Sequence, residues 1–185
     1  PEHSVATCTP SPLALTRTVA VEARKVTNTV SGKVVLSLGA ALMVVFGFGR
    51  AFFPAADTTF GRIATIACIP GSWVIMAVSV LLISGEFTRR EAAITFTLDP
   101  RRGRVLAAKT VVAAGLALAT ACWALIVAGG AYLLAPALTG VTLPPDLEVS
   151  RITAVFGGLV FTALAGVSLG LLTRNAVAPI VVMLA

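Results

Sequence analysis

The chain has 185 residues, of which 57% are hydrophobic and 12% are charged, and its mean hydropathy is +0.97. An ordinary soluble domain is about 45–50% apolar and about 25% charged, so this composition excludes a water-soluble single domain. The formal net charge is +6, with fourteen Lys and Arg against eight Asp and Glu. In so apolar a chain, basic residues are typical of loops beside a membrane, which argues for lipid and against nucleic acid as a partner.

No cofactor or metal is expected in this chain, and it is not predicted to be an enzyme. The cysteines lack C-x-x-C spacing and are odd in number: Cys8, Cys68 and Cys122. That pattern indicates neither a disulfide framework nor a zinc site. Gly32 and Lys33 form a Gly-Lys pair without the upstream glycine and the following Ser or Thr of a phosphate-binding loop. The carboxylates fall outside the long apolar runs, and the one histidine, His3, is near the N-terminus.

The first thirty or so residues precede any stretch that could cross a membrane. Residues 1–12 include Pro10 and Pro12 and are expected to form a mobile cytoplasmic tail. Over residues 13–32, apolar side chains recur at three- and four-residue steps with basic ones opposite them, which predicts an amphipathic helix lying in the membrane interface. Glu22 falls near the apolar edge of this pattern. The alternative is a cytosolic helix packed on a partner protein.

Four stretches are long and apolar enough to span a bilayer, which requires about 20 residues. They cover residues 34–53, 63–85, 105–134 and 152–173. A further apolar run begins at residue 176 and has not reached spanning length at Ala185. We therefore predict an all-α integral membrane protein, a helical bundle with four complete spans and a truncated fifth, in a chain that continues beyond Ala185.

The distribution of basic residues predicts the orientation of these spans. Four lysines and arginines precede the first span, six lie between or just inside the second and third, and one follows the fourth. The remaining three, Arg50, Arg62 and Arg151, fall on the opposite side. Because basic residues concentrate in short cytoplasmic loops, the N-terminus is predicted to lie inside.

Small residues mark one side of the fourth span at four-residue intervals: Ala154, Gly158, Thr162, Gly166 and Gly170. Such a stripe allows close approach of a second helix within lipid, so we expect Gly158, Thr162, Gly166 and Gly170 to form a helix-packing surface. A weaker stripe follows Ala113, Ala117, Ala121 and Gly129 in the third span. The alternative is that an Ala- and Gly-rich sequence produces such stripes by chance.

The spans themselves offer no energy source. The sequence has no charged residue between Arg62 and Glu86 or between Arg151 and Arg174. Transporters driven by protons or sodium place ionisable residues deep in their helices. The second and fourth spans have no charged residue, and Arg50 and Lys109 lie near the ends of the first and third. If the protein transports a substrate, we expect its energy to come from a partner chain.

The segment at residues 86–104, between the second and third spans, is too long to be a simple turn. Charged residues at both of its ends flank an apolar middle, which favours a short helix that ends at Asp99-Pro100. Arg101, Arg102 and Arg104 follow, and their guanidinium groups suit lipid phosphates or an acidic protein surface. The alternative is a solvated positive loop that only fixes topology.

This segment resembles the corresponding stretch of the type 2 ATP-binding-cassette exporter permeases, of the compact bacterial kind. Their pattern is Glu followed by an aromatic residue, a Pro some fourteen residues later, basic residues, and a Leu-x-x-Lys that opens the third span. The matching positions here are Glu86, Phe87, Pro100, Arg102, Arg104, Leu106 and Lys109. Glu22, Arg24 and Lys25 are similar to the Glu-x-x-Lys pattern of that family's N-terminal helix. The chain departs from many relatives in having Arg90-Glu91 in place of a Gly-Thr pair.

The resemblance implies a six-span permease subunit in a bacterial plasma membrane. In that family it pairs with a second permease half, in a homodimer or heterodimer, and with separate ATPase subunits that bind ATP and Mg²⁺. The resemblance assigns the ATPase contact to Glu86, Phe87, Arg89, Arg90 and Glu91, with Arg24 and Lys25 as a secondary contact.

Two other functions fit the sequence. One is a non-transporting subunit that anchors or scaffolds a larger membrane complex, which agrees with the short outer loops. The other is a secondary transporter whose acidic residues follow Ala185. For an exporter, the uncharged spans favour a hydrophobic or amphipathic substrate.

Overall fold

A computed structural model describes residues 12–55, 57–88, 102–140, 142, 144 and 149–173. Within these ranges, side chains are described except at residues 12–15, 85–88, 102, 104 and 173. Every regular element in these ranges is a helix. In chain order the helices are α1 (Pro12–Asn28), α2 (Val30–Phe52), α3 (Phe60–Thr88), α5 (Arg102–Thr139) and α6 (Val149–Thr173).

Four of these helices are long and apolar enough to cross a membrane, as the sequence predicted. The qualifying stretches are Val30–Phe52, Phe60–Ser84, Val105–Thr139 and Val149–Leu172. The chain is therefore consistent with a multi-pass membrane protein. The predicted fifth span, from residue 176, lies outside the described residues.

The third predicted span ends later than the sequence indicated. The prediction stopped at residue 134, before Pro136, whereas α5 continues through this proline to Thr139. A proline removes one backbone hydrogen bond, but it does not stop a helix whose neighbouring turns are well packed, and Ala131 and Ala135 are fully buried here. The helix ends at Gly140, which has a φ of 69° and whose N–H donates to the Pro136 carbonyl at 3.0 Å.

The predicted connecting segment at 86–104 is also shorter than expected. α3 continues to Thr88 and α5 already begins at Arg102. Charged residues do not break a helix, so both helices extend beyond their apolar stretches. Residues 89–101, including the expected helix end at Asp99-Pro100, lie outside the described residues.

The N-terminal helix ends four residues before the predicted boundary, at a sharp corner with α2. Thr29 adopts an extended backbone (φ −72°, ψ 142°) and caps α2 by accepting a hydrogen bond from the Gly32 N–H at 3.2 Å. The Thr29 hydroxyl also donates to the carbonyl of Val26 at 3.4 Å. A Cβ on Gly32 would lie 1.9 Å from that same Val26 oxygen. The corner thus requires a glycine, because backbone approaches backbone there.

Gly32→Ala is expected to lower the free energy of unfolding by about 1–3 kcal/mol, because the new methyl group forces the corner open. Thermal unfolding in detergent micelles would measure this change. Gly49→Ala, also in α2, is the matched control, since nothing lies within 4 Å of its added Cβ. Equal midpoints for the two variants would contradict the proposed role of Gly32.

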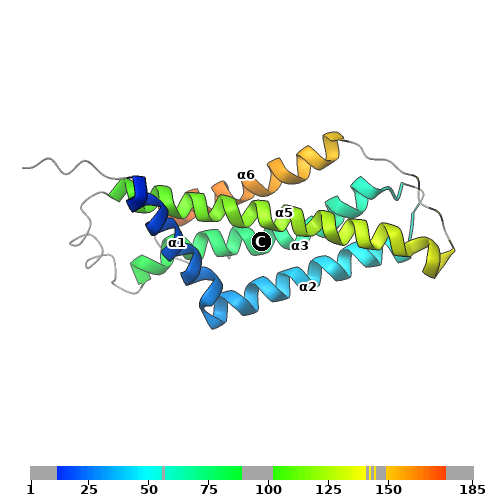
Figure 1. Ribbon diagram of the computed structural model, residues 1–185, viewed down its shortest axis with the longest axis horizontal. Helices are drawn as coiled ribbons and strands as arrows, with labels where there is room; N and C mark the ends of the chain where they lie inside the picture. The colour runs from blue at the N-terminus through cyan, green and yellow to red at the C-terminus, as the bar shows by residue number, and fades with distance from the viewer. Residues whose placement is uncertain are drawn as a thin grey trace, which may run out of the picture.

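The four long helices run antiparallel to their chain neighbours (Figure 1). α3 packs against α2, α5 and α6, and α5 also contacts α2 and α6. α2 and α6 therefore flank a central α3–α5 pair, and α1 crosses one end of the bundle, where it contacts α5 and α2. We call this end the α1 end; α3 finishes there and α5 begins there.

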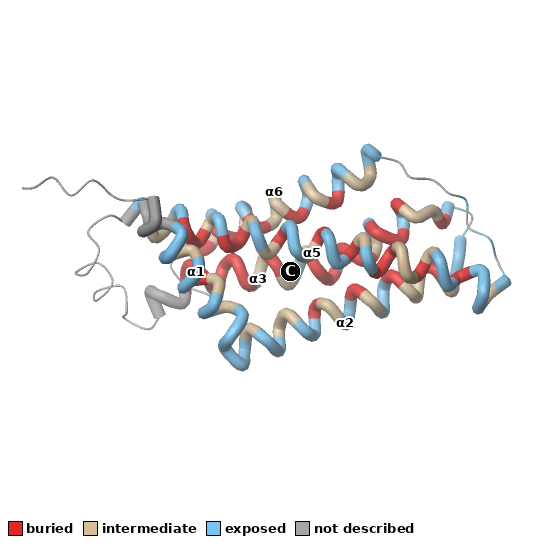
Figure 2. Tube along the Cα trace, in the orientation of Figure 1, coloured by how far each residue is buried: buried red, intermediate tan, exposed pale blue. Residues whose placement is uncertain are grey.

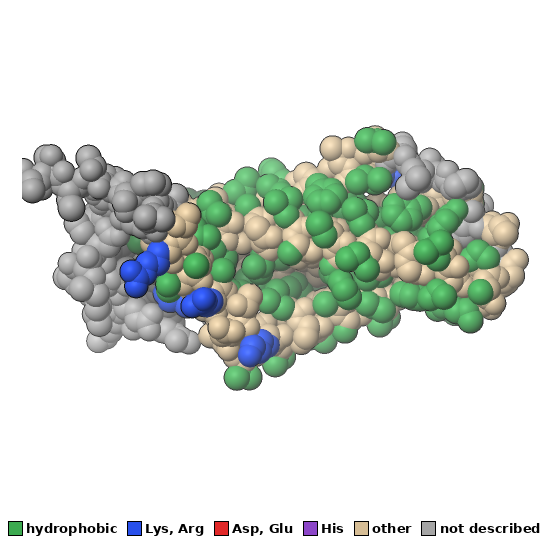
Figure 3. All heavy atoms as spheres, in the orientation of Figure 1, with side chains coloured by type: hydrophobic (Ala, Val, Ile, Leu, Met, Phe, Trp, Pro, Cys, Tyr) green, Lys and Arg blue, Asp and Glu red, His purple; other side chains and the backbone are tan. Residues whose placement is uncertain are grey.

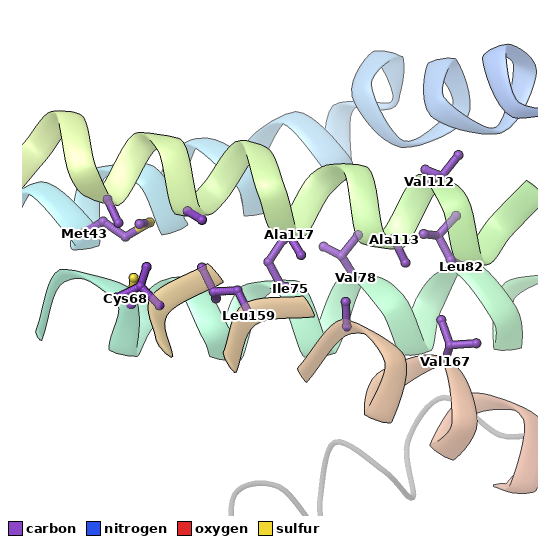
Figure 4. Close-up of a cluster of buried hydrophobic side chains, with 14 of the residues drawn as sticks. Met43, Cys68, Ile75, Val78, Leu82, Val112, Ala113, Ala117, Leu159 and Val167 are labelled. Carbon is purple, nitrogen blue, oxygen red and sulfur yellow. The ribbon is translucent and has the colours of Figure 1, made fainter. Parts of the chain in front are cut away.

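Buried residues follow the inward sides of α3 and α5, while much of α2 is exposed (Figure 2). The larger core cluster joins α2, α3, α5 and α6, with Met43, Ile75, Val78, Leu159 and Val167 among its members (Figure 4). α5 contributes mostly alanines, and Ala117 and Ala121 are fully buried. These small side chains let α5 approach its neighbours closely, as the weaker stripe predicted, although Gly129 has nothing within 4 Å of an added Cβ.

Candidate functional site

The α1 end joins chain segments that are distant in sequence. The inward side of α1 carries Val19, Ala23 and Val26, which pack against the larger core cluster. Leu106, near the start of α5, packs against the same cluster. The apolar side of α1 thus faces the protein's own bundle.

Glu22 lies on this inward side, although the sequence placed it near the apolar edge. The residue is 4% exposed, as is Lys109 of α5. Lys109 Nζ donates to Glu22 Oε2 at 3.2 Å, and Lys25 Nζ donates to Glu22 Oε1 at 2.9 Å. Both carboxylate oxygens therefore have cationic donors, which is what burial of a carboxylate requires.

Lys109 extends this contact to a third helix. Its Nζ donates to the backbone carbonyl of Leu82 in α3 at 2.7 Å, besides the bond to Glu22. Leu82 lies on the core side of α3, near Val112 of α5 (Figure 4). A single ammonium group thus joins α1, α3 and α5. We call Lys25, Glu22, Lys109 and the Leu82 carbonyl the α1 link.

Sequence reasoning missed the α1 link, although a signal was present. Glu22 is the one acidic residue of the Pro12–Asn28 helix, and it lies among apolar positions. Lys109 is the one basic residue within the Val105–Thr139 stretch. Isolated opposite charges on two apolar faces indicate a buried pair, because each is costly to bury alone. The sequence does not show that these two faces meet.

The environment of Glu22 also determines its protonation. Burial works to raise the pKa of Glu22, but the hydrogen bond from Lys25 and the charges of Lys109 and Lys25 outweigh it and hold the pKa below its ordinary value. The unfolded chain therefore takes up this proton first on acidification. The stability from the ionised carboxylate is present above the unfolded pKa and is lost as the pH falls through the lower folded pKa.

We expect the difference in thermal midpoint between the native protein and Glu22→Gln to stay constant from neutral pH to about pH 5 and to shrink below about pH 4. The comparison between the two proteins removes contributions from other carboxyl groups. Thermal scans in one detergent across this range would measure it. A difference that already shrinks between neutral pH and about pH 5.5 would contradict a lowered pKa.

The residues predicted to contact an ATPase gather toward this end only in part. The backbone of Glu86 and Phe87 forms the last turn of α3, whereas Arg89, Arg90 and Glu91 lie outside the described residues. Arg24 and Lys25 are exposed on α1, as is Arg17. On the face shown in Figure 3, basic side chains gather over α1 and the beginning of α2, while hydrophobic side chains cover the bundle. Lys25 is thus both a surface group and a partner of Glu22.

The predicted packing stripe of α6 divides into two parts. A Cβ on Gly166 would lie 2.8 Å from Ser79 Cβ and 2.9 Å from the Met76 carbonyl oxygen, and one on Gly170 would lie 3.0 Å from Ile83 Cβ. Gly158 is exposed and has nothing within 4 Å, and the Thr162 hydroxyl donates to the Gly158 carbonyl of its own helix.

The stripe does not form one surface because a helix turns every 3.6 residues. Positions four apart rotate by about 40° at each step, so Gly158 faces away where Gly166 faces α3. The side of α6 that packs at the beginning of the helix carries Val155, Leu159 and Ala163 instead. Gly158 is therefore not a packing residue within the described part of the chain, whereas the packing role of Thr162 stays a prediction.

The opposite end of the bundle has its own charged contact. Asp57, between α2 and α3, accepts one hydrogen bond from Arg50 Nη2 at 2.5 Å and forms an ion pair with Arg62 Nε at 3.2 Å. These are two of the three arginines that the topology prediction placed away from the N-terminus. The side chain of the third, Arg151, packs on Gly61.

Among the residues that the structure describes, no group of three or more His, Cys, Asp or Glu could hold a metal ion. The chain matches no protein-family model, no curated protein and no solved structure.

Proposed function

We propose that this chain is the permease subunit of an ATP-driven exporter in a bacterial plasma membrane. A separate ATPase subunit binds and hydrolyses ATP, a second permease half completes the pathway, and the substrate is a hydrophobic or amphipathic compound. The N-terminus and the α1 end face the cytoplasm in this proposal. The α1 end is then the side that the ATPase reaches.

One observation carries the proposal. The two segments that resemble ATPase contacts come from distant parts of the sequence, yet both belong to the α1 end. α1 crosses this end with Arg24 and Lys25 exposed, and the last turn of α3, with Glu86, finishes there. An ATPase docked at this end would touch both segments. That arrangement supports a coupling surface built from α1 and the end of α3.

The polar groups of the bundle agree with an external energy source. Lys109, the one basic residue of the Val105–Thr139 stretch, is bound to Glu22 and the Leu82 carbonyl. The α3 and α6 spans have no charged residue between Arg62 and Glu86 or between Arg151 and Arg174. A transport cycle would therefore alternate two packings of the helices, biased by ATP-dependent closure of the partner.

Purification from native membranes in a mild detergent tests the proposal directly. We expect an ATPase to copurify, and we expect Glu86→Ala or Arg90→Ala to weaken its association about tenfold, which corresponds to about 1.4 kcal/mol. Arg62→Ala is the matched control, because Arg62 is exposed at the opposite end. A protein that purifies without ATPase and moves no substrate with ATP would contradict the proposal and favour the scaffold function.

A further inference from the structure

We propose that Glu22 is a positioning residue: through Lys109 it fixes α1 to the last turns of α3, so that the two segments move as one body. This inference rests on the proposed function, because it assigns the route by which force on α1 reaches the bundle. The contact joins α1, α3 and α5 through the Glu22 carboxylate and the Lys109 ammonium group. None of these groups needs to touch the transported substrate.

The α1 link extends from the protein surface to the backbone of α3. Lys25 has 58% of its side chain exposed, and its Nζ reaches Glu22 Oε1. The other oxygen of the same carboxylate accepts from Lys109, whose Nζ also donates to the Leu82 carbonyl. A continuous series of polar contacts thus runs from the exposed side of α1 to the backbone of α3. If an acidic group on a docked ATPase drew Lys25 outward, Glu22 would lose its hydrogen bond from Lys25.

Leu82 lies close in α3 to the candidate ATPase contact at Glu86. Its carbonyl is one helical turn before Glu86, and α3 continues to Thr88. Residues four apart in a helix lie on the same side, so Lys109 holds the turn that precedes the candidate contact at Glu86. A carbonyl oxygen has two lone pairs, so the bond from Lys109 does not require that the helical bond of Leu82 be broken.

Burial makes the contact between Glu22 and Lys109 costly to break. Glu22 and Lys109 are each 4% exposed, so α1 cannot leave the bundle without separating two buried charges. Apolar contacts such as those of Val19 and Val26 allow a helix to slide, whereas hydrogen-bonded charges fix its distance and register. The α1 link therefore provides a stiff connection where apolar packing alone would provide a soft one.

Thiol labelling measures docking of α1 without reference to transport. In full-length protein whose native cysteines are replaced by serine, Val19→Cys reports on the inward side of α1. Val21→Cys is the control on the outer side, where Val21 is 48% exposed. We expect Glu22→Gln to raise the labelling rate at position 19 about tenfold and to leave position 21 unchanged. Unchanged labelling at position 19 would overturn the inference.

Transport measures whether the link does more than hold α1 in place. The double variant Glu22→Leu/Lys109→Met replaces the charges with apolar groups of similar size, so α1 is expected to stay docked. We expect this variant to keep ATPase binding and hydrolysis but to lose about tenfold in substrate moved per ATP. Lys109→Arg, which keeps the donors, is expected to retain transport.

The two proposals fail in different ways. Native transport per ATP in the double variant would overturn the positioning role and leave the proposed function standing. If Glu22→Gln labels faster but the protein binds no ATPase, the missing ATPase overturns the proposed function and the route of force. The faster labelling would still support the docking contact between α1 and the bundle.

The charge-swapped variant Glu22→Lys/Lys109→Glu is expected to fail in transport, because a carboxylate at 109 cannot donate to the Leu82 carbonyl. Native transport by that variant would overturn the inference.

Discussion

Lys109→Met is expected to lower the free energy of unfolding by about 3–5 kcal/mol, because it leaves the buried Glu22 carboxylate without its ammonium partner. The Leu82 carbonyl loses its donor in the same variant. Reversible unfolding in mixed micelles, monitored by circular dichroism, would measure the change. The effect should exceed that of an apolar substitution of similar size on the lipid-facing side of α5, such as Leu118→Met, because Leu118 is 46% exposed.

Adding Glu22→Leu to this variant should restore most of the lost stability. Removing the second charge ends the penalty of an unpaired carboxylate, and buried ion pairs are often replaced by apolar residues without loss. The two substitutions are thus expected to be strongly non-additive, as is usual for groups in direct contact. A double variant that is less stable than Lys109→Met would show that the two residues act separately.

Gly166→Ala is expected to lower the free energy of unfolding by about 1–3 kcal/mol, since the added methyl group overlaps the backbone of α3. The nearest atoms are Ser79 Cβ and the Met76 carbonyl oxygen, both under 3.0 Å from the new carbon. Neither atom can move without shifting the helix. α6 would have to separate from α3, its most extensive neighbour.

Gly158→Ala is the matched control for that experiment. It lies in the same helix and the same predicted stripe, but it has open space around the added Cβ. Alanine is the better helix former by about 1 kcal/mol, so this variant should be neutral or slightly more stable. A loss of stability at Gly158 equal to that at Gly166 would mean that Gly158 also packs against a helix, as the stripe first suggested.

The sequence was sufficient to predict the helices that could cross a membrane. Spanning length and the absence of charge are local properties, so residues 63–85 and 152–173 could be located within a few residues of Phe60–Ser84 and Val149–Leu172. Boundaries set by specific contacts were harder to predict. The corner at Thr29 depends on the approach of the Val26 carbonyl to Gly32, and the extension of α5 past Pro136 depends on buried neighbours.

The candidate site shows the same division. Arg24 and Lys25 could be identified from sequence by their resemblance to a known pattern, and their exposure on α1 agrees with a surface role. The ATPase contact itself, and the roles of Arg89, Arg90 and Glu91, stay predictions. Glu22 and Lys109 were each noted in the sequence, but not as partners, because no periodic pattern relates a residue of α1 to one of α5.

The sequence by itself determined that this chain folds as long apolar helices, because hydropathy acts residue by residue. Only the tertiary structure decided which sides of those helices meet. It turned Glu22 inward onto Lys109, brought Gly166 but not Gly158 against α3, and placed α1 across the end of the bundle where α3 finishes. Those outcomes depend on the rotation and crossing of packed helices, which are set by the shapes of both partners and not by either sequence segment alone.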